Sequence, residues 1–276
     1  MSPDPILEAR SVSKWYPKRV GALRRRVGTI RAVDEVSCAL GRGETLGLVG
    51  ESGCGKTTLA KLLIGLLAPS RGEALVDGRS FSGLKGPPLR AARRAVQYVF
   101  QDPMNSLNPR LTVEETLSEP LLIHQLARGN ARRSRVRELL STVQLPADYA
   151  SRLPRELSGG ERQRVGIARA LATEPEALIC DEPIASLDVS VGAQILELLR
   201  TLAGQRRMAI LFISHDLRAI ASLCQRIAVM KSGRILEAAP TEELLNRSRQ
   251  PYTTLLIRSA ELDLDAPDVS DTSRST

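Results

Sequence analysis

The sequence predicts an α/β fold: a mixed sheet flanked by helices, with an antiparallel β subdomain and an inserted helical subdomain. Three features of the chain support this prediction. Short apolar runs such as residues 44–49 are followed by stretches with helical periodicity. Residues 6–16 and 31–40 instead have the alternation of two paired strands. Residues 112–157 are mostly helical in pattern and show no strand signal, so we expect a helical insertion over about 102–160.

Composition places the chain among ordinary soluble globular proteins. It has 276 residues, of which 42% are hydrophobic and 25% charged, enough for one large domain or two small ones. No apolar run reaches the length of a membrane span, and the first residues lack the basic and apolar regions of a signal peptide. Cys38, Cys54, Cys180 and Cys224 form no C-x-x-C pair, so we expect buried thiols in a reducing, cytoplasmic compartment.

The formal charge of +8 is concentrated in two stretches. Residues 18–31 carry six Lys or Arg and no acid, and residues 128–137 carry five Arg. Only 3% of residues are aromatic, and neither stretch has the interleaved aromatic rings that stack on bases. We therefore expect no nucleic-acid partner. Solvated surface is the preferred interpretation of these stretches, and proximity to anionic lipid headgroups is the alternative.

Residues 50–58 match the phosphate-binding loop G-x-x-x-x-G-K-[ST]. A strand-like run, 44–49, precedes the loop, and a stretch of helical periodicity, 59–67, follows it. The glycines let backbone N–H groups point inward, and the helix directs its positive dipole end at the same place. Lys56 can then reach the β- and γ-phosphates, and the Thr57 hydroxyl can ligate Mg²⁺. The expected nucleotide-binding residues of the loop are Gly50, Glu51, Ser52, Gly53, Cys54, Gly55, Lys56, Thr57 and Thr58.

The N-terminal segment predicts a hairpin whose strands, 6–16 and 31–40, are joined by the basic stretch as a loop. Trp15 and Tyr16 end its first strand; spacing alone leaves open whether they are core rings or a ring stacked on adenine. Residues 72–78 and 95–100 predict further strands. The second of these leads into residues 101–110, a loop rich in turn formers.

Residues 157–164 open a helix with apolar positions on one face. Ser158 and Glu161 have the spacing of a capping box, which explains the helix start in purely structural terms. The functional interpretation is compatible with it, because a capped helix start that opens with glycines is also an anion site.

Two later apolar runs end in polar residues. Residues 177–180 predict a buried strand followed by Asp181 and Glu182, whose adjacent carboxylates are costly to bury without a partner. Mg²⁺ near ATP phosphates would be a partner for the first, and the second could polarise an attacking water. Residues 208–213 predict another strand that leads to His215 in the same sense, and ligands bind at the carboxyl ends of parallel strands.

The rest of the chain predicts simple elements. We expect an amphipathic helix over 192–203, a strand pair over 226–237 that turns at Ser232 and Gly233, and short helices over 242–259. Residues 260–276 are acidic, rich in Ser and Thr and free of aromatics, so they predict a disordered tail.

Together these motifs resemble the ATP-binding cassette of ABC transporters, over residues 6–259. The signature Leu157-Ser158-Gly159-Gly160 distinguishes ATP-binding cassettes from other P-loop proteins, which lack it. The resemblance implies a P-loop NTPase core in one cassette, residues 1–259, with the helical subdomain inside it. It also implies an ATPase that uses ATP and Mg²⁺ and releases ADP and phosphate.

The resemblance assigns roles to single residues. Glu182 becomes the general base, His215 contacts the γ-phosphate, and Lys56 completes the catalytic group. Tyr16 stacks on adenine, and Asp188 belongs to the loop that links two active sites. Thr57, Gln101 and Asp181 bind Mg²⁺, and Gln101 also senses the membrane partner. The signature residues that act on a partner's nucleotide are Leu157, Ser158, Gly159, Gly160 and Gln163.

Residues 101–110 and 251–256 narrow the resemblance to the peptide/nickel branch of importer ATPases. This branch implies a peripheral protein on the cytoplasmic face of the membrane, which powers import of peptides, nickel or related small solutes by ATP-driven dimer closure. Its expected partners are a second, non-identical ABC ATPase, two integral membrane permease subunits and an extracytoplasmic substrate-binding protein.

One departure and one alternative accompany this interpretation. Many peptide-importer members continue into a cysteine-containing region, whereas this chain stops shortly after Ser259. No iron–sulfur cluster is expected, and the short form is similar to some nickel-type and antimicrobial-peptide-type members. The alternative is a non-transport ABC ATPase in DNA repair or translation, or an assembly scaffold. The first usually has two cassettes or long coiled coils, and intact Glu182 and His215 disfavour the second.

Overall fold

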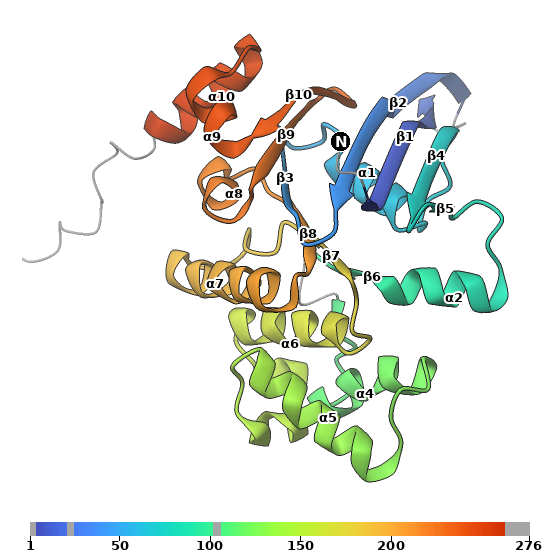
Figure 1. The fold of residues 1–276 in the computed structure, drawn as a ribbon, viewed down its shortest axis with the longest axis vertical. Helices are drawn as coiled ribbons and strands as arrows, with labels where there is room; N and C mark the ends of the chain where they lie inside the picture. The colour runs from blue at the N-terminus through green and yellow to red at the C-terminus, as the bar shows by residue number, and fades with distance from the viewer. Residues whose placement is uncertain (1–3, 21–24, 102–105, 263–276) are drawn as a thin grey trace, which may run out of the picture.

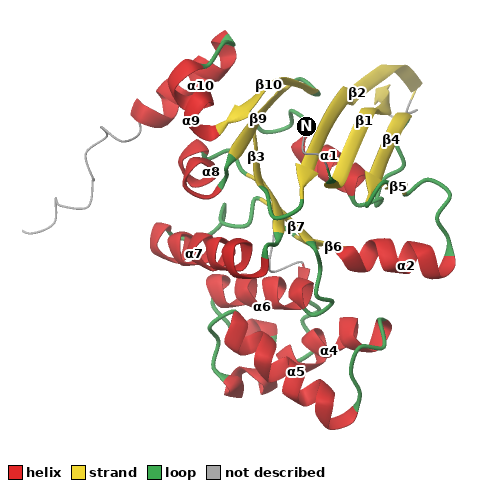
Figure 2. Ribbon diagram, viewed as in Figure 1, coloured by secondary structure: helices red, strands yellow, loops and turns green. Residues whose placement is uncertain are grey.

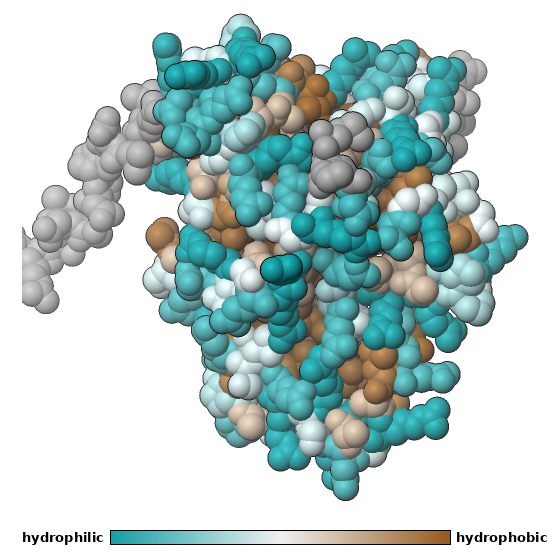
Figure 3. Space-filling model, viewed as in Figure 1, coloured by the Kyte–Doolittle hydropathy of each residue, from teal (hydrophilic) through white to brown (hydrophobic). Residues whose placement is uncertain are grey.

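The computed structural model describes residues 4–20, 25–101 and 106–262. In this part of the chain, the strands form one antiparallel and one largely parallel sheet, and helices pack around them (Figures 1 and 2). The α/β prediction, with a mixed sheet and a separate antiparallel sheet, is confirmed. The face seen in Figure 3 is mostly hydrophilic, with apolar side chains only in small separate groups.

The antiparallel sheet has the strand order β2-β1-β4-β5. Its strands are β1 (Pro5–Val20), β2 (Arg25–Gly41), β4 (Arg71–Val76) and β5 (Arg79–Ser80). The larger sheet has the order β10-β9-β3-β8-β7-β6. Its strands are β3 (Thr45–Val49), β6 (Val96–Val99), β7 (Ala177–Asp181), β8 (Ala209–Ile213), β9 (Arg226–Lys231) and β10 (Arg234–Pro240).

The helices fall into three groups along the chain. α1 (Lys56–Leu63) follows β3, and α2 (Gly86–Ala95) precedes β6. The helical region then comprises α4 (Val113–Ile123), α5 (Gly129–Thr142), the short 3-10 helices η1 (Ala147–Ser151) and η2 (Pro154–Glu156), and α6 (Gly159–Leu171). The last group is α7 (Val189–Arg206), α8 (Leu217–Leu223), α9 (Thr241–Arg247) and α10 (Pro251–Leu262).

Strand direction in the larger sheet decides where polar residues gather. β3, β6, β7, β8 and β9 run parallel to one another, and β10 is antiparallel to β9. β3, β7 and β8 are buried along their whole length, as expected for parallel strands covered on both faces. Their carboxyl ends therefore share one edge of the sheet, where the chain turns from apolar to polar residues.

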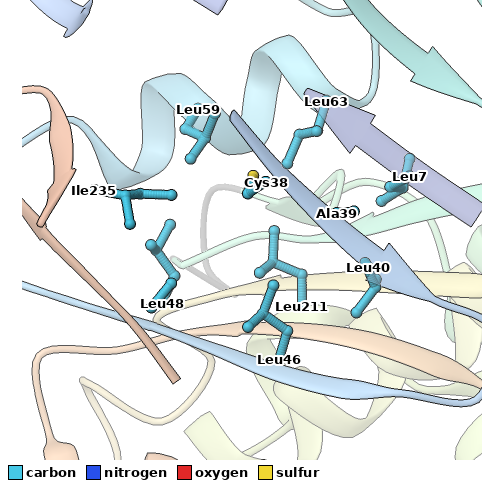
Figure 4. Close-up of a pocket in the computed structure, with 11 residues that line it drawn as sticks. Leu7, Cys38, Ala39, Leu40, Leu46, Leu48, Leu59, Leu63, Leu211 and Ile235 are labelled. Atoms are coloured by element: carbon cyan, nitrogen blue, oxygen red, sulfur yellow. The ribbon is translucent and has the colours of Figure 1, made fainter. Parts of the chain in front are cut away.

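The core between the two sheets is closely packed. In Figure 4, Leu59 and Leu63 of α1 face Leu46, Leu48 and Leu211 of the larger sheet. The cavity that these side chains line, together with residues of β1 and β2, has a volume of about 10 Å³. A space of this size holds at most one water, and its lining is apolar, so it is part of the core and not a ligand site.

The predicted loop over the basic stretch is largely wrong. β1 continues to Val20 and β2 begins at Arg25, so the hairpin is extended as a ribbon in which Tyr16 pairs with Ile30 and Lys18 with Gly28. Ile30 is 52% exposed, so this ribbon has no buried face to produce a clear alternation in the sequence. Arg24 and the side chains of Arg19, Arg25 and Arg26 lie outside the described residues.

The helical region lies at the end of the molecule opposite the antiparallel sheet (Figure 1). α4 and α5 pack against α6, which in turn contacts β6 and α7. α4 begins with a capping box in which the Thr112 hydroxyl accepts from Glu115 N. The first four residues of the predicted insertion, 102–105, are not described.

The C-terminal elements match the expected strand pair and short helices. The turn at Ser232 and Gly233 joins β9 to β10, as predicted. α10 runs to Leu262, so the last helix extends three residues into the range predicted as tail, and residues 263–276 lie outside the description. No described helix is both long and apolar enough to cross a membrane.

Candidate nucleotide site

Polar residues from several strand ends meet at a cavity of about 420 Å³. The phosphate loop follows β3, Gln101 follows β6, Glu182 follows β7, and His215 follows β8. The residues that line the cavity are Ala32, Ser52, Gly53, Gly55, Lys56, Thr57, Thr58, Gln101, Glu182 and His215. The size is that of a small-molecule pocket, and most of the predicted site is assembled there.

The phosphate loop fits only because two of its residues are glycines. A Cβ on Gly50 would lie 2.1 Å from the Met230 carbonyl oxygen, and one on Gly55 would lie 2.2 Å from the Ala32 carbonyl oxygen. Gly55 also has a φ of 116°, which side chains rarely allow. From the β9–β10 turn, Gly233 N donates to Cys54 O at 2.8 Å. The loop is thus held between β2 and the C-terminal strand pair.

Lys56 is buried at the start of α1 and is bonded to the loop itself. Its Nζ donates to Gly50 O at 2.6 Å and to Glu51 O at 3.1 Å. The ammonium group is therefore held against the loop that leads into α1, and the dipole of that helix also favours negative charge at its start. An anion of the size of a phosphate group is the natural ligand of this arrangement.

Asp181 is buried at the end of β7, and its two oxygens have different surroundings. Oδ2 accepts from the Thr57 hydroxyl at 2.8 Å and from the Tyr98 hydroxyl at 2.6 Å. Oδ1 has no hydrogen-bond partner among the described residues. A buried carboxylate oxygen without a partner is costly, and hard cations such as Mg²⁺ bind carboxylate and hydroxyl oxygens. The donor set of Asp181 and Thr57 therefore fits Mg²⁺.

Tyr98, on β6, is a site residue that the sequence analysis missed. Burial raises the pKa of its hydroxyl, and the charge of Asp181 and the hydrogen bond to it raise that pKa further. The hydroxyl thus remains a proton donor to Asp181. Its importance depends on β6 lying next to β7, and the sequence carries no signal for that pairing.

Glu182 and His215 form a pair in the cavity. Glu182 Oε2 lies 2.9 Å from His215 Nδ1, and the imidazole is exposed whereas the carboxylate is buried. Glu182 has a φ of 49°, a conformation that costs about 1–2 kcal/mol for a residue with a side chain. Its N–H is fixed to Ile213 O at 2.9 Å. Asp181 bonds to Thr57 and Tyr98 whereas Glu182 contacts His215, so the two adjacent carboxylates have different partners.

Tyr16 does not line the cavity. It lies on the β1–β2 ribbon opposite Ile30 and is 37% exposed, with the Lys14 ammonium 5.7 Å from its ring. The neighbouring Trp15 ring contacts the guanidinium groups of Arg31 and Arg71, at 5.8 and 5.0 Å. Of these two aromatics, Tyr16 is exposed and Trp15 is half-buried.

Ser158 caps α6, and this helix start lies apart from the cavity. The Ser158 hydroxyl accepts from Glu161 N at 3.3 Å, and Glu161 Oε2 accepts from Ser158 N at 2.7 Å. Tyr149 donates to the other Glu161 oxygen at 2.6 Å, and this bond lowers the Glu161 pKa. The predicted capping box is present. Ser158 itself is exposed and Gly159 is half-buried.

Three other signature residues are buried, and Asp188 caps a different helix. Leu157, Gly160 and Gln163 are buried, so the Gln163 side chain does not face solvent with Ser158. Asp188 caps α7, where its carboxylate accepts from Val191 N at 2.9 Å and from the Ser190 hydroxyl at 2.8 Å. These hydrogen bonds lower the pKa of Asp188. Val189, next to it, is 92% exposed.

The phosphate loop, between a buried parallel strand and the start of α1, is the arrangement of P-loop nucleotide-binding proteins. Comparison with known proteins specifies the family. Residues 33–185 match the family model described as "ABC transporter". The chain is 46% identical to a probable peptide ABC transporter ATP-binding protein of Sinorhizobium fredii, over 93% of this chain and 73% of that protein.

Two further comparisons agree. The oligopeptide transport ATP-binding protein AppF of Bacillus subtilis is 44% identical over 93% of this chain and 78% of its own length. A solved dimeric post-hydrolysis state of the ATP-binding cassette MJ0796, bound to ADP and Pi, superposes with a TM-score of 0.75 at 30% identity. That alignment covers 85% of this chain and 98% of the other. The chain belongs to the ABC transporter family and is an ATP-hydrolysing subunit.

Proposed function

We propose that this ATPase powers the import of peptides or related small solutes. The supporting observation is the 42–46% identity, over 93% of the chain, to proteins named as peptide or oligopeptide transport ATP-binding proteins. A glutathione import ATP-binding protein of Pectobacterium atrosepticum is 44% identical, although this chain covers only 41% of it. That nickel is a transported solute is supported only by the resemblance of residues 101–110 and 251–256 to the peptide/nickel branch.

ATP would bind with its phosphates in the loop 50–58 and its adenine on Tyr16. Lys56, which now donates to the carbonyls of Gly50 and Glu51, would donate to phosphate oxygens instead. Thr57, Asp181 and Gln101 would hold Mg²⁺. When bound, this ion would supply positive charge that offsets the negative charge of the phosphates.

Hydrolysis is assigned to Glu182 and His215. Water attacks the γ-phosphorus, the bond to the β-phosphate oxygen breaks, and Glu182 accepts the proton of the water. His215 orients the Glu182 carboxylate through the contact at 2.9 Å. Because its imidazole is exposed in the cavity, it can also turn toward the γ-phosphate.

The exposed start of α6 supports a paired arrangement. Ser158 lies outside the cavity of its own chain, so Leu157, Ser158, Gly159 and Gly160 would act on the nucleotide of a second ABC ATPase, with Asp188 linking the sites. Gln163 would support this helix start from its buried side. A dimer of this kind closes over two ATP molecules.

The remaining partners follow from import as the function. The cassette would span residues 1–259, with the helical subdomain at about 102–160. Gln101 and this subdomain would pass the motion of dimer closure to two integral membrane permease subunits. An extracytoplasmic substrate-binding protein would deliver the solute. The chain would act at the cytoplasmic face of the membrane.

The test is reconstitution of the chain with its partner ATPase, permease subunits and binding protein in vesicles. We expect ATP hydrolysis to rise when the binding protein carries a peptide, and peptide to enter the vesicles. Equal hydrolysis with and without peptide, but stimulation by DNA or ribosomes, would favour the non-transport alternative.

A further inference from the structure

The last helix of the chain contacts the phosphate loop directly. The hydroxyl oxygen of Tyr252, on α10, accepts a hydrogen bond from Glu51 N at 3.2 Å, across 201 residues of sequence. Tyr252 is only 8% exposed. None of the roles assigned above uses this contact, and it involves the stretch 251–256, which the sequence analysis linked to a branch of importers without giving it a chemical role.

The contact falls on the peptide group that also binds Lys56. The C=O of Gly50 and the N–H of Glu51 belong to the same planar peptide unit. Lys56 Nζ donates to Gly50 O at 2.6 Å, and Glu51 N donates to the Tyr252 hydroxyl oxygen. Hydrogen bonds at the two ends of one peptide polarise each other, so each strengthens the other.

Tyr252 is itself held in place from several sides. The Lys231 ammonium lies 4.2 Å from the centre of its ring, and the ring belongs to the main hydrophobic cluster. The start of α10 is tied to β10, because Arg249 N and Gln250 N donate to the Glu237 carboxylate at 2.8 and 3.3 Å. The hydroxyl is therefore presented to the loop by a rigid support.

We propose that Tyr252 is a positioning residue for the phosphate loop. When Lys56 turns to a phosphate, Gly50 O loses a hydrogen bond, and the peptide between Gly50 and Glu51 loses one of its two restraints. The bond from Glu51 N to Tyr252 keeps that peptide in the orientation required by the nucleotide. This inference rests on the proposed binding of ATP phosphates by the loop.

The experiment compares Tyr252→Phe with wild type, using the full chain and Mg-ATP as the ligand. Phenylalanine keeps the ring, its packing and its contact with Lys231, and removes only the acceptor. We expect ATP to bind about three- to tenfold more weakly, the effect of one hydrogen bond. In the assembled transporter, KM for ATP should rise by a similar factor while kcat stays within about twofold of wild type.

A second readout reports on the contact itself. Amide hydrogen exchange at Glu51 should be faster in nucleotide-free Tyr252→Phe than in wild type, because its acceptor is gone. Lys231→Met, which loosens the ring but keeps the hydroxyl, should weaken ATP binding in the same direction by a smaller factor. Ser259→Ala is the matched control, because it removes an exposed hydroxyl that bonds within α10, to Leu255 O.

The outcomes separate this inference from the proposed function. Unchanged ATP affinity and unchanged Glu51 exchange in Tyr252→Phe would overturn the positioning role while the site assignment stands. Equal weakening in Ser259→Ala would also overturn it, since the effect would then come from a general loosening of α10. A wild-type chain that binds no ATP would overturn the role of the loop and this inference together.

Discussion

At the scale of single residues, the site contains two neighbouring carboxylates, Asp181 and Glu182, whose hydrogen-bond partners differ. Asp181 has one oxygen occupied by Thr57 and Tyr98, and the other has no described partner. Glu182 is turned toward His215 by a strained backbone conformation. These neighbours in the sequence therefore have different partners, as our proposal of a cation ligand and a general base requires.

Glu182→Gln tests the assignment of the base. Glutamine preserves the shape of the side chain but cannot accept a proton, so turnover in the assembled complex should fall by about 10²-fold or more. ATP binding, measured by titration of the same protein, should remain close to that of wild type. Lys56→Ala should instead weaken ATP binding itself. Near-normal hydrolysis by Glu182→Gln would show that another group is the base.

Tyr98→Phe tests the support of the proposed cation site. If Thr57 leaves Asp181 to bind Mg²⁺, Tyr98 is the remaining described donor to Oδ2, so its loss should leave the carboxylate poorly oriented. We expect cation affinity to fall by about tenfold, as for other residues that orient metal ligands. Mn²⁺ binding in the presence of ATP, followed by electron paramagnetic resonance, measures this. An unchanged Mn²⁺ affinity would limit Tyr98 to a packing role.

At the scale of elements, strand ends and helix starts carry the chemistry. The sequence predicted most of these correctly, because buried parallel strands are continuous apolar runs and the helix at Ser158 begins with a capping box. It failed at the β1–β2 ribbon, whose exposed strands are held by main-chain pairing and leave no apolar pattern. It also ended the chain's last helix three residues early, at 259 instead of Leu262.

Ser158→Arg tests whether the start of α6 acts on a partner's nucleotide. The isolated variant should bind ATP normally, because its own cavity does not include Ser158. Hydrolysis at the partner's phosphate loop should fail, since the arginine side chain blocks closure there. The measurement uses a complex in which only the partner retains its catalytic Glu. Lost binding in the isolated variant, or normal hydrolysis in that complex, would exclude the arrangement.

At the scale of the whole molecule, the phosphate loop is the place where distant parts of the chain meet. β2 contacts it through Ala32, β9 through Met230, the β9–β10 turn through Gly233, and α10 through Tyr252. The C-terminal elements therefore help to hold the phosphate loop, although no motif in the sequence connects them with it.

Gly50→Ala tests this convergence. The added Cβ would meet the Met230 carbonyl, a backbone atom that cannot move without displacing β9. We expect a loss of roughly 1–3 kcal/mol of stability in chemical denaturation, together with weaker ATP binding. Gly166→Ala, in α6, is the control: apart from its chain neighbours and its own helix backbone, no described heavy atom lies within 4 Å of the added Cβ, and alanine favours a helix. Equal destabilisation by both changes would contradict the close packing of the loop.

The sequence by itself determined the chemistry that lies in continuous stretches. The loop 50–58, the pair Asp181 and Glu182, and His215 could be found because each follows a buried strand within a few residues. Tertiary structure decided which groups hold them. Tyr98 reaches Asp181 across 83 residues and Tyr252 reaches Glu51 across 201. Such contacts depend on strand order and on where helices dock, and these are set by packing of the whole core, so no local pattern records them.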